Sequence, residues 1–203
     1  MMDDRQLSFV SRETIEKLRT FEALALKWTK KINLISSGDA EHLWERHILD
    51  SVQIYPLAPS SGDWLDIGSG GGFPGIVAAI IGHELAPQRN FTLVDSDQRK
   101  CAFLRTVSRE LSLNVKVLAS RVDEIPPLGA DVLTARALDD LQSLLHHAER
   151  HLAPHGTALF PKGSSWQKEN GEAMKFWSYT LDVIPSETNP NATILKIKEL
   201  SRV

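Results

Sequence analysis

The sequence has almost no cysteine. Its 203 residues include one, Cys101, so no disulfide forms within the chain and a reducing compartment is expected. No apolar run approaches the length that crosses a membrane. Residues 1–4 end in two aspartates and lead into no apolar core, so we expect no signal peptide. These absences predict a protein of the cytoplasm that does not bind a membrane.

An excess of positive charge is also missing. There are 23 Lys and Arg against 26 Asp and Glu, a net charge of −3, so any contact with nucleic acid must come from a local patch. Apolar content is ordinary, at 42% hydrophobic residues. The length suits one α/β unit with an added segment, and the residue pattern predicts a helical segment over residues 1–60 packed on one globular unit over 61–203.

What the chain does have is a concentration of glycine after a short apolar stretch. Leu65 and Ile67 suit a buried strand, and four of the five residues from 68 to 72 are glycine. Glycines admit unusual backbone torsions and let a ligand approach the main chain closely. Pro74 then suits the first turn of a helix. The stretch predicts a strand, a turn and a helix N-terminus that bind a nucleotide-like ligand, or a tight turn without one.

Several common motifs are absent around this turn. Phe73 stands where a dinucleotide-binding turn has its third glycine, and no lysine follows as in a P-loop. A nucleoside-bearing cofactor with a compact tail therefore fits better than a dinucleotide or a triphosphate. No His/Cys cluster has metal-ligand spacing, since His146 and His147 are adjacent and point in different directions on a helix, so we expect no metal. A Gly-x-Ser-x-Gly nucleophile elbow is also absent.

Periodicity predicts an α/β fold with a mostly parallel sheet. Expected strands cover 64–67, 91–95, 115–118, 130–135 and 156–160, and expected helices cover 74–82, a segment from Asp97, and 138–152. The tail, over 176–184 and 192–197, predicts an antiparallel hairpin at one edge of the sheet.

Before the sheet, the pattern predicts helices. Ser11 caps a first helix with an apolar stripe at Ile15, Leu18, Phe21, Leu24 and Trp28. We expect Asp39 to cap a second helix, which carries the run 46–51. On it Arg46 shares a face with Asp50, four residues on, which indicates either a surface ion pair or an RNA-facing surface.

Each predicted strand delivers polar groups at its carboxyl end, where open α/β sheets bind ligands. These are Asp66, Asp95, the run 120–124, Arg136 and Lys162. Asp95 lies 27 residues beyond Gly68, close to the spacing of about 20 residues typical of a ribose-binding acid. Each of these residues alone is equally compatible with a helix cap or a rim charge, but together they predict one binding site.

In order along the chain, these motifs resemble the glucose-inhibited division protein B family of bacterial 16S ribosomal RNA guanine-N7 methyltransferases. The resemblance is carried from about residue 20 to 165 by the following segments: Asn33-Leu34, 46–51, 66–75, 120–123 and 135–137. Gly71 departs from the alanine or proline more common in the family, and Thr134 from the usual serine.

The resemblance implies a Rossmann-like class I S-adenosylmethionine-dependent methyltransferase. It also implies S-adenosylmethionine as cofactor and 16S ribosomal RNA or the 30S subunit as partner, and we expect a monomer. The cofactor-binding candidates are Asp66, Gly68, Gly70, Phe73, Asp95, Val122, Asp123 and Arg136. The catalytic candidates are Arg136, Arg46 and His47, and the RNA-binding candidates are Arg121, Lys162, Asp50 and Ser51. Guanine N7 keeps a lone pair, so transfer to it needs orientation and no general base.

Other interpretations remain open from the sequence. A methyltransferase acting on another RNA or on a protein would share the whole cofactor site. A nicotinamide-dependent oxidoreductase is disfavoured by Phe73 and Pro74 after the glycines. A non-catalytic RNA-binding module would keep cofactor affinity without turnover.

Overall fold

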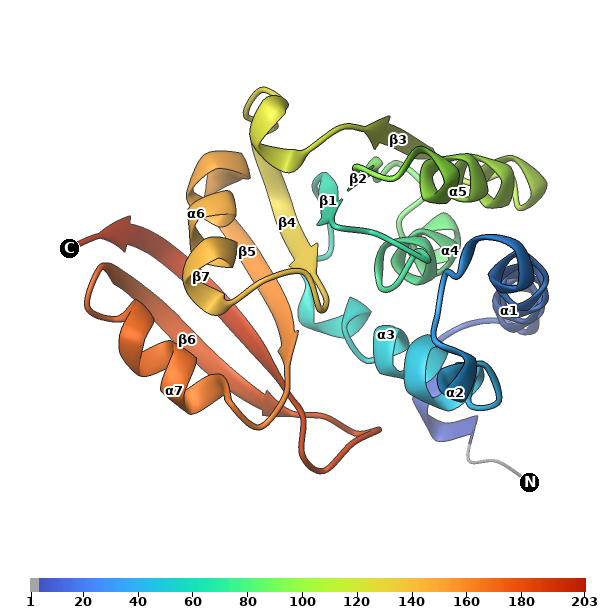
Figure 1. The fold of residues 1–203 in the computed structure, drawn as a ribbon, viewed down its shortest axis with the longest axis horizontal. Coiled ribbons are helices and arrows are strands. Elements are labelled where there is room, and N and C mark those ends of the chain that lie inside the picture. Colours follow the sequence, from blue (N-terminus) through green and yellow to red (C-terminus); the bar gives the residue numbers. More distant parts are fainter. Residues whose placement is uncertain (1–3) are drawn as a thin grey trace.

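The computed structural model describes residues 4–203, so residues 1–3 of the expected N-terminal segment and of its acidic start lie outside the described residues (Figure 1). Within the described range, seven strands form one sheet in the order β3-β2-β1-β4-β5-β7-β6. The strands are β1 Trp64–Ile67, β2 Phe91–Asp95, β3 Val115–Ala119, β4 Ala130–Ala135, β5 Leu152–Lys162, β6 Trp177–Pro185 and β7 Thr193–Arg202. The α-helices are α1 Arg12–Ile32, α2 Ser37–Ala40, α3 Asp50–Val52, α4 Gly75–Leu85, α5 Gln98–Glu110, α6 Leu141–His151 and α7 Trp166–Ala173.

Strands β1 to β5 run parallel, and β7 pairs antiparallel with both β5 and β6. This confirms the mostly parallel sheet, the C-terminal hairpin and the preceding helices. Because β1 lies at the centre with both faces covered, all four of its residues are buried. In the pairing register Asp66 lies beside Thr134 of β4, which brings the start of the glycine turn next to the end of that strand.

The two faces of the sheet bury separate cores. Trp64, Leu93 and Val132 pack with α1, α3, α4 and α5 on one face. Leu65, Ile67 and Leu133 pack with α6 and α7 on the other. In Figure 1, α1 and α4 therefore lie to the right of the central strands, and α6 and α7 to the left. Because successive side chains of a strand point to opposite faces of the sheet, the apolar side chains of β1 contribute to both cores.

The first helix follows the prediction. The Ser11 hydroxyl accepts a hydrogen bond from the Thr14 N–H at 3.2 Å, and Leu18 and Phe21 are fully buried. Glu84 of α4 accepts hydrogen bonds from Ser11 and Thr14, which ties the start of α1 to the end of α4. The first helix is therefore fixed against α4.

The second helix departs from the prediction. Ser36, not Asp39, is the N-cap, because the Ser36 hydroxyl accepts the Asp39 N–H and also donates to the Asp39 carboxylate at 2.6 Å. The expected single helix is divided into α2, a π-helical segment η2 over Trp44–Leu49, and α3. Short 3₁₀ turns precede α1 (η1 Asp4–Leu7), follow α3 (η3 Tyr55–Leu57) and follow β3 (η4 Val122–Glu124).

One further boundary differs, and one helix is additional. The helix expected over 138–152 begins at Leu141, because the Asp140 side chain accepts the Ser143 N–H at 2.9 Å and caps it there. Residues 136–140 form a loop between β4 and α6. Helix α7, which lies between β5 and β6, was not predicted. Among residues 4–203 no helix is both long and apolar enough to span a bilayer.

Candidate functional site

A cavity of about 240 Å³ lies at the carboxyl ends of β1, β2 and β3. We call it the strand-end cavity. Its lining includes five of the predicted site residues: Gly68, Asp95, Arg121, Val122 and Asp123. Since these residues come from the ends of three adjacent parallel strands, the structure brings them together at the edge where open α/β sheets bind ligands.

The glycine turn is tied to the next strand by the Asp95 carboxylate. The Gly70 N–H donates to Asp95 Oδ2 at 2.8 Å, and the Asp97 N–H donates to Asp95 Oδ1 at 2.8 Å. Gly68 and Gly70 have φ values of +63° and +53°, which disfavour any side chain. A Cβ built at Gly70 would meet no atom closer than the Gly68 carbonyl oxygen, at 3.7 Å. At Gly70 the turn therefore offers bare main chain facing open space.

Asp66 lies beneath this turn and does not line the cavity. It has no exposed surface; its Oδ1 accepts the Thr134 hydroxyl at 2.7 Å, and Thr134 in turn accepts the Trp64 Nε1–H at 3.0 Å. Its Oδ2 has no hydrogen-bond partner within residues 4–203. Burial raises the pKa of Asp66 to about 6, against the opposing hydrogen bond from Thr134. Asp66 therefore exposes no side-chain atom that could make the predicted contact with the cofactor.

Phe73, at the end of the turn, also lies outside the cavity lining. Its ring is buried, with its centroid 5.1 Å from that of Phe21 and 5.1 Å from that of His47. The Arg136 guanidinium lies over the same ring, 5.2 Å from its centroid. Phe73 thus connects the glycine turn to the surroundings of Arg136.

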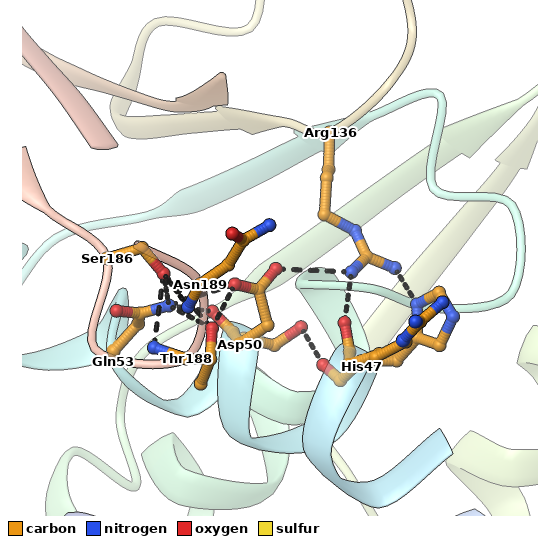
Figure 2. A network of polar contacts seen from close by, with 9 residues as sticks. His47, Asp50, Gln53, Arg136, Ser186, Thr188 and Asn189 are labelled. Atoms are coloured by element: carbon orange, nitrogen blue, oxygen red, sulfur yellow. Dashed lines mark hydrogen bonds and ion pairs between the residues drawn. The ribbon is translucent and has the colours of Figure 1, made fainter. Parts of the chain in front are cut away.

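Arg136 lies at the end of β4, between His47 and Asp50 (Figure 2). One terminal nitrogen is 2.7 Å from His47 Nδ1, and the other is 3.4 Å from Asp50 Oδ2. An arginine only donates, so His47 accepts through Nδ1 and its proton is assigned to Nε2. Burial, with the positive charge of Arg136, lowers the pKa of His47 to about 4. His47 is therefore neutral near pH 7.

The ion pair expected between Arg46 and Asp50 does not form. Arg46, whose side chain is 62% exposed, pairs instead with Asp39 at 2.8 Å. The π-helical winding of η2 alters the angular spacing on which that expectation depended, and Asp50 faces Arg136. Ser51 is fully buried and donates to the His47 carbonyl at 2.6 Å, so its hydroxyl has no exposed surface for RNA.

A second cavity, of about 410 Å³, opens beside Arg136. We call it the Arg136 cavity. Asp50 and Lys162 also line it, and Asp139 belongs to the lining of both cavities. Lys162 is held by an ion pair with Glu169 at 2.6 Å and donates to the Asp139 carbonyl at 3.1 Å. The predicted RNA-binding residues are therefore divided, with Arg121 at one cavity and Asp50 and Lys162 at the other.

Sequence reasoning missed several residues of these cavities. His147 and Leu138 line the strand-end cavity, and Leu138 lies so close to Gly68 that an added Cβ would come within 2.6 Å of it. His147 Nδ1 is 3.4 Å from Asp123 Oδ1. From the sequence, His147 is considered only in relation to a metal site, because nothing in its spacing marks it as a cavity residue. Among residues 4–203 no three His, Cys, Asp or Glu side chains are grouped to hold a metal ion.

Comparison with known proteins gives concordant results. The family model described as rRNA small subunit methyltransferase G matches residues 14–189. The ribosomal RNA small subunit methyltransferase G of Ruegeria sp. (strain TM1040) is 53% identical over 194 residues, which are 96% of this chain and 95% of that protein. The protein of the same name from Ruegeria pomeroyi is 49% identical over 203 residues, the full length of both. The crystal structure of a SAM dependent methyltransferase from Aquifex aeolicus shares the fold, with a TM-score of 0.59 and 14% identity over 78% of this chain and 93% of that one.

Proposed function

The chain belongs to the rRNA small subunit methyltransferase G family, and from this we propose that it transfers a methyl group from S-adenosylmethionine to 16S ribosomal RNA. The acceptor that we propose is N7 of a guanine in a loop of that RNA. The observation that carries the proposal is the strand-end cavity, built from the glycine turn and Asp95, in a chain about half identical to ribosomal RNA methyltransferases.

The residues of the strand-end cavity fit S-adenosylmethionine. Each Asp95 oxygen accepts one backbone N–H and keeps a second lone pair for a ribose hydroxyl. Gly70 leaves room for close approach to the main chain, Gly68 lines the cavity, and Val122 and Asp123 would hold the adenine. When bound, S-adenosylmethionine supplies a methyl group on a sulfonium, already activated for transfer.

The chain's own task is then orientation. Guanine N7 has an in-plane lone pair and no proton to lose, so no residue needs to act as a general base. Arg136, from the end of the strand beside the glycine turn, would hold the incoming base or its phosphate at the Arg136 cavity. His47 would act through Arg136, because its neutral ring accepts the Arg136 hydrogen bond and its Nε2 is buried.

The RNA side would be formed by exposed charges near the two cavities. Arg121 is exposed and would reach phosphates directly, whereas Arg46 would first have to leave Asp39 and Lys162 would have to leave Glu169. Because the net charge is −3, a ribosomal particle that adds further contacts fits better than naked RNA. We further propose a monomer of one folded unit, working in the cytoplasm where the small subunit is assembled, without a metal.

The experiment that tests this function is transfer of radiolabelled methyl groups to 30S particles that lack the modification. The modified nucleotide is then mapped by reverse transcription after cleavage at N7-methylguanine. Label at one guanine N7 of 16S RNA is the expected result. Label on ribosomal protein or on another RNA would support the alternative methyltransferase, and cofactor binding without label on any fraction would favour an RNA-binding module.

A further inference from the structure

The turn between β6 and β7, residues 186–192, lies against the helical segment that carries Asp50 (Figure 2). We propose that Thr188 and Gln53 are positioning residues for Arg136, acting through the carboxylate of Asp50. This inference rests on the proposed function, because it assigns Arg136 a part in methyl transfer.

The two oxygens of the Asp50 carboxylate have different partners. Oδ1 accepts the Thr188 hydroxyl at 2.8 Å and the Gln53 side-chain N–H at 2.9 Å. Oδ2 faces Arg136, at 3.4 Å. That distance is well beyond the roughly 2.7–2.9 Å of a strong charge-assisted hydrogen bond. The contact with Arg136 alone therefore does not fix the carboxylate, and the shorter bonds to Oδ1 set its orientation.

Gln53 joins this carboxylate to the backbone of the turn. Its Oε1 accepts the Glu187 N–H at 2.8 Å, and its Nε2 is 3.0 Å from the Ser186 hydroxyl. The Ser186 hydroxyl also accepts the N–H groups of Thr188 and Asn189, both at 3.3 Å. The turn is thus held in one shape and docked on the residue that follows α3, which places the Thr188 hydroxyl at Asp50.

This arrangement has an effect on one cavity only. Ser186, Asn189 and Asp50 line the Arg136 cavity, whereas no residue of the hairpin lines the strand-end cavity. Because Asp50 and Arg136 both line the Arg136 cavity, a carboxylate freed from Thr188 has room to rotate away from the guanidinium. Loss of the Thr188 hydroxyl should therefore impair transfer without weakening cofactor binding.

The test uses the full chain with Thr188→Val, which keeps the shape and removes the donor, and Thr188→Ser, which restores it. Thr180→Val is the matched control, because the Thr180 hydroxyl lies on the same hairpin but donates to Glu199 and not to Asp50. For Thr188→Val on 30S particles we expect kcat to fall about tenfold, the Kd for S-adenosylmethionine to stay within about twofold, and Thr188→Ser to recover most of the rate. In an Asp50→Ala background, Thr188→Val should cause no further loss.

A second readout does not depend on activity. The Arg136 Nε–H resonance, assigned by its disappearance in Arg136→Lys, should shift or broaden in Thr188→Val and not in Thr180→Val. Wild-type protein that transfers no label would overturn the proposed function and this inference with it. An active wild type with an equally active Thr188→Val, or an unmoved Arg136 resonance, would overturn the inference alone. A fall in rate that simply follows the unfolded fraction, measured by circular dichroism, would also overturn it.

Discussion

The Gly70 amide donates a 2.8 Å hydrogen bond to the Asp95 carboxylate, so one side chain at the end of β2 holds the glycine turn at the end of β1. The same carboxylate faces the strand-end cavity. Asp95 therefore shapes the main chain that would contact the cofactor, and it would also offer the acceptor for the ribose. Substitution of Asp95 should consequently weaken cofactor binding more than it lowers the stability of the folded chain.

Replacing Asp95 by alanine should weaken S-adenosylmethionine binding. The change removes the acceptor for the Gly70 N–H and for the ribose, and lost hydrogen bonds of this kind cost about 1–3 kcal/mol, or about 5- to 150-fold in Kd. Isothermal titration calorimetry measures the effect. Asp97→Asn is the control, since Asp97 caps α5 two residues away and lies outside the cavity lining. Unchanged affinity in Asp95→Ala would remove Asp95 from the cofactor site.

Gly70→Asp should abolish cofactor binding. Gly70 has a φ of +53°, where a side chain is strained by about 1–2 kcal/mol, and its Cβ would point into open space at the turn. The new carboxylate would also stand beside Asp95 and repel it. Calorimetry should give no heat of binding, while circular dichroism shows a folded chain.

Gly171→Ala is the matched control for that substitution. Gly171 lies within α7, where an added Cβ meets no atom within 4 Å and the backbone is helical. The alanine should leave binding unchanged and stabilise the helix by about 0.5–1 kcal/mol. Normal cofactor affinity in Gly70→Asp would mean that the glycine turn reverses the chain without holding a ligand.

The parts of the molecule that were predictable depend on local patterns. The Ser11 cap, the glycine turn and the placement of Asp95 follow from neighbouring residues or from the ends of adjacent parallel strands. Asp39 was misassigned because Ser36, three residues earlier, caps the same turn. The environment of Asp50 was not predictable: its partners Arg136 and Thr188 are 86 and 138 residues away, and no spacing rule links them.

The buried carboxylate of Asp66 should make the protein less stable as pH rises from about 4 to 6. Its pKa is raised from 3.8 to about 6 in the folded chain, so in this window the unfolded chain has already lost the proton and the folded chain keeps it. The free energy of unfolding should fall by up to about 3 kcal/mol over this range, a contribution that Asp66→Asn removes. Urea unfolding of both proteins at several pH values measures the difference.

Titration of His47 changes the free energy of unfolding in the opposite direction. The effect of Asp66 is therefore measured as the difference between wild type and Asp66→Asn. The pKa of His47 is lowered to about 4 by burial and by Arg136, so its contribution to stability is present above about pH 6.5 and is lost as pH falls toward 4. In His47→Gln the loss of stability that His47 causes as the pH falls from about 6.5 toward 4 should therefore be absent. A stability difference between wild type and Asp66→Asn that does not change between pH 4 and 7 would contradict the assignment of Asp66.

Arg136→Ala should reduce methyl transfer far more than stability. The guanidinium bonds His47 and faces Asp50, yet Asp50 keeps its bonds from Thr188 and Gln53 when Arg136 is removed, so unfolding should become easier by only about 1–2 kcal/mol. The rate on 30S particles should fall about 100-fold, as expected for loss of a positioned donor, with an unchanged Kd for S-adenosylmethionine. Arg202→Ala is a suitable control, because Arg202 forms a surface ion pair with Glu149 at 2.7 Å. If Arg136→Ala methylates 30S particles at the wild-type rate, the guanidinium has no part in transfer, and the base must be oriented by groups other than this cluster.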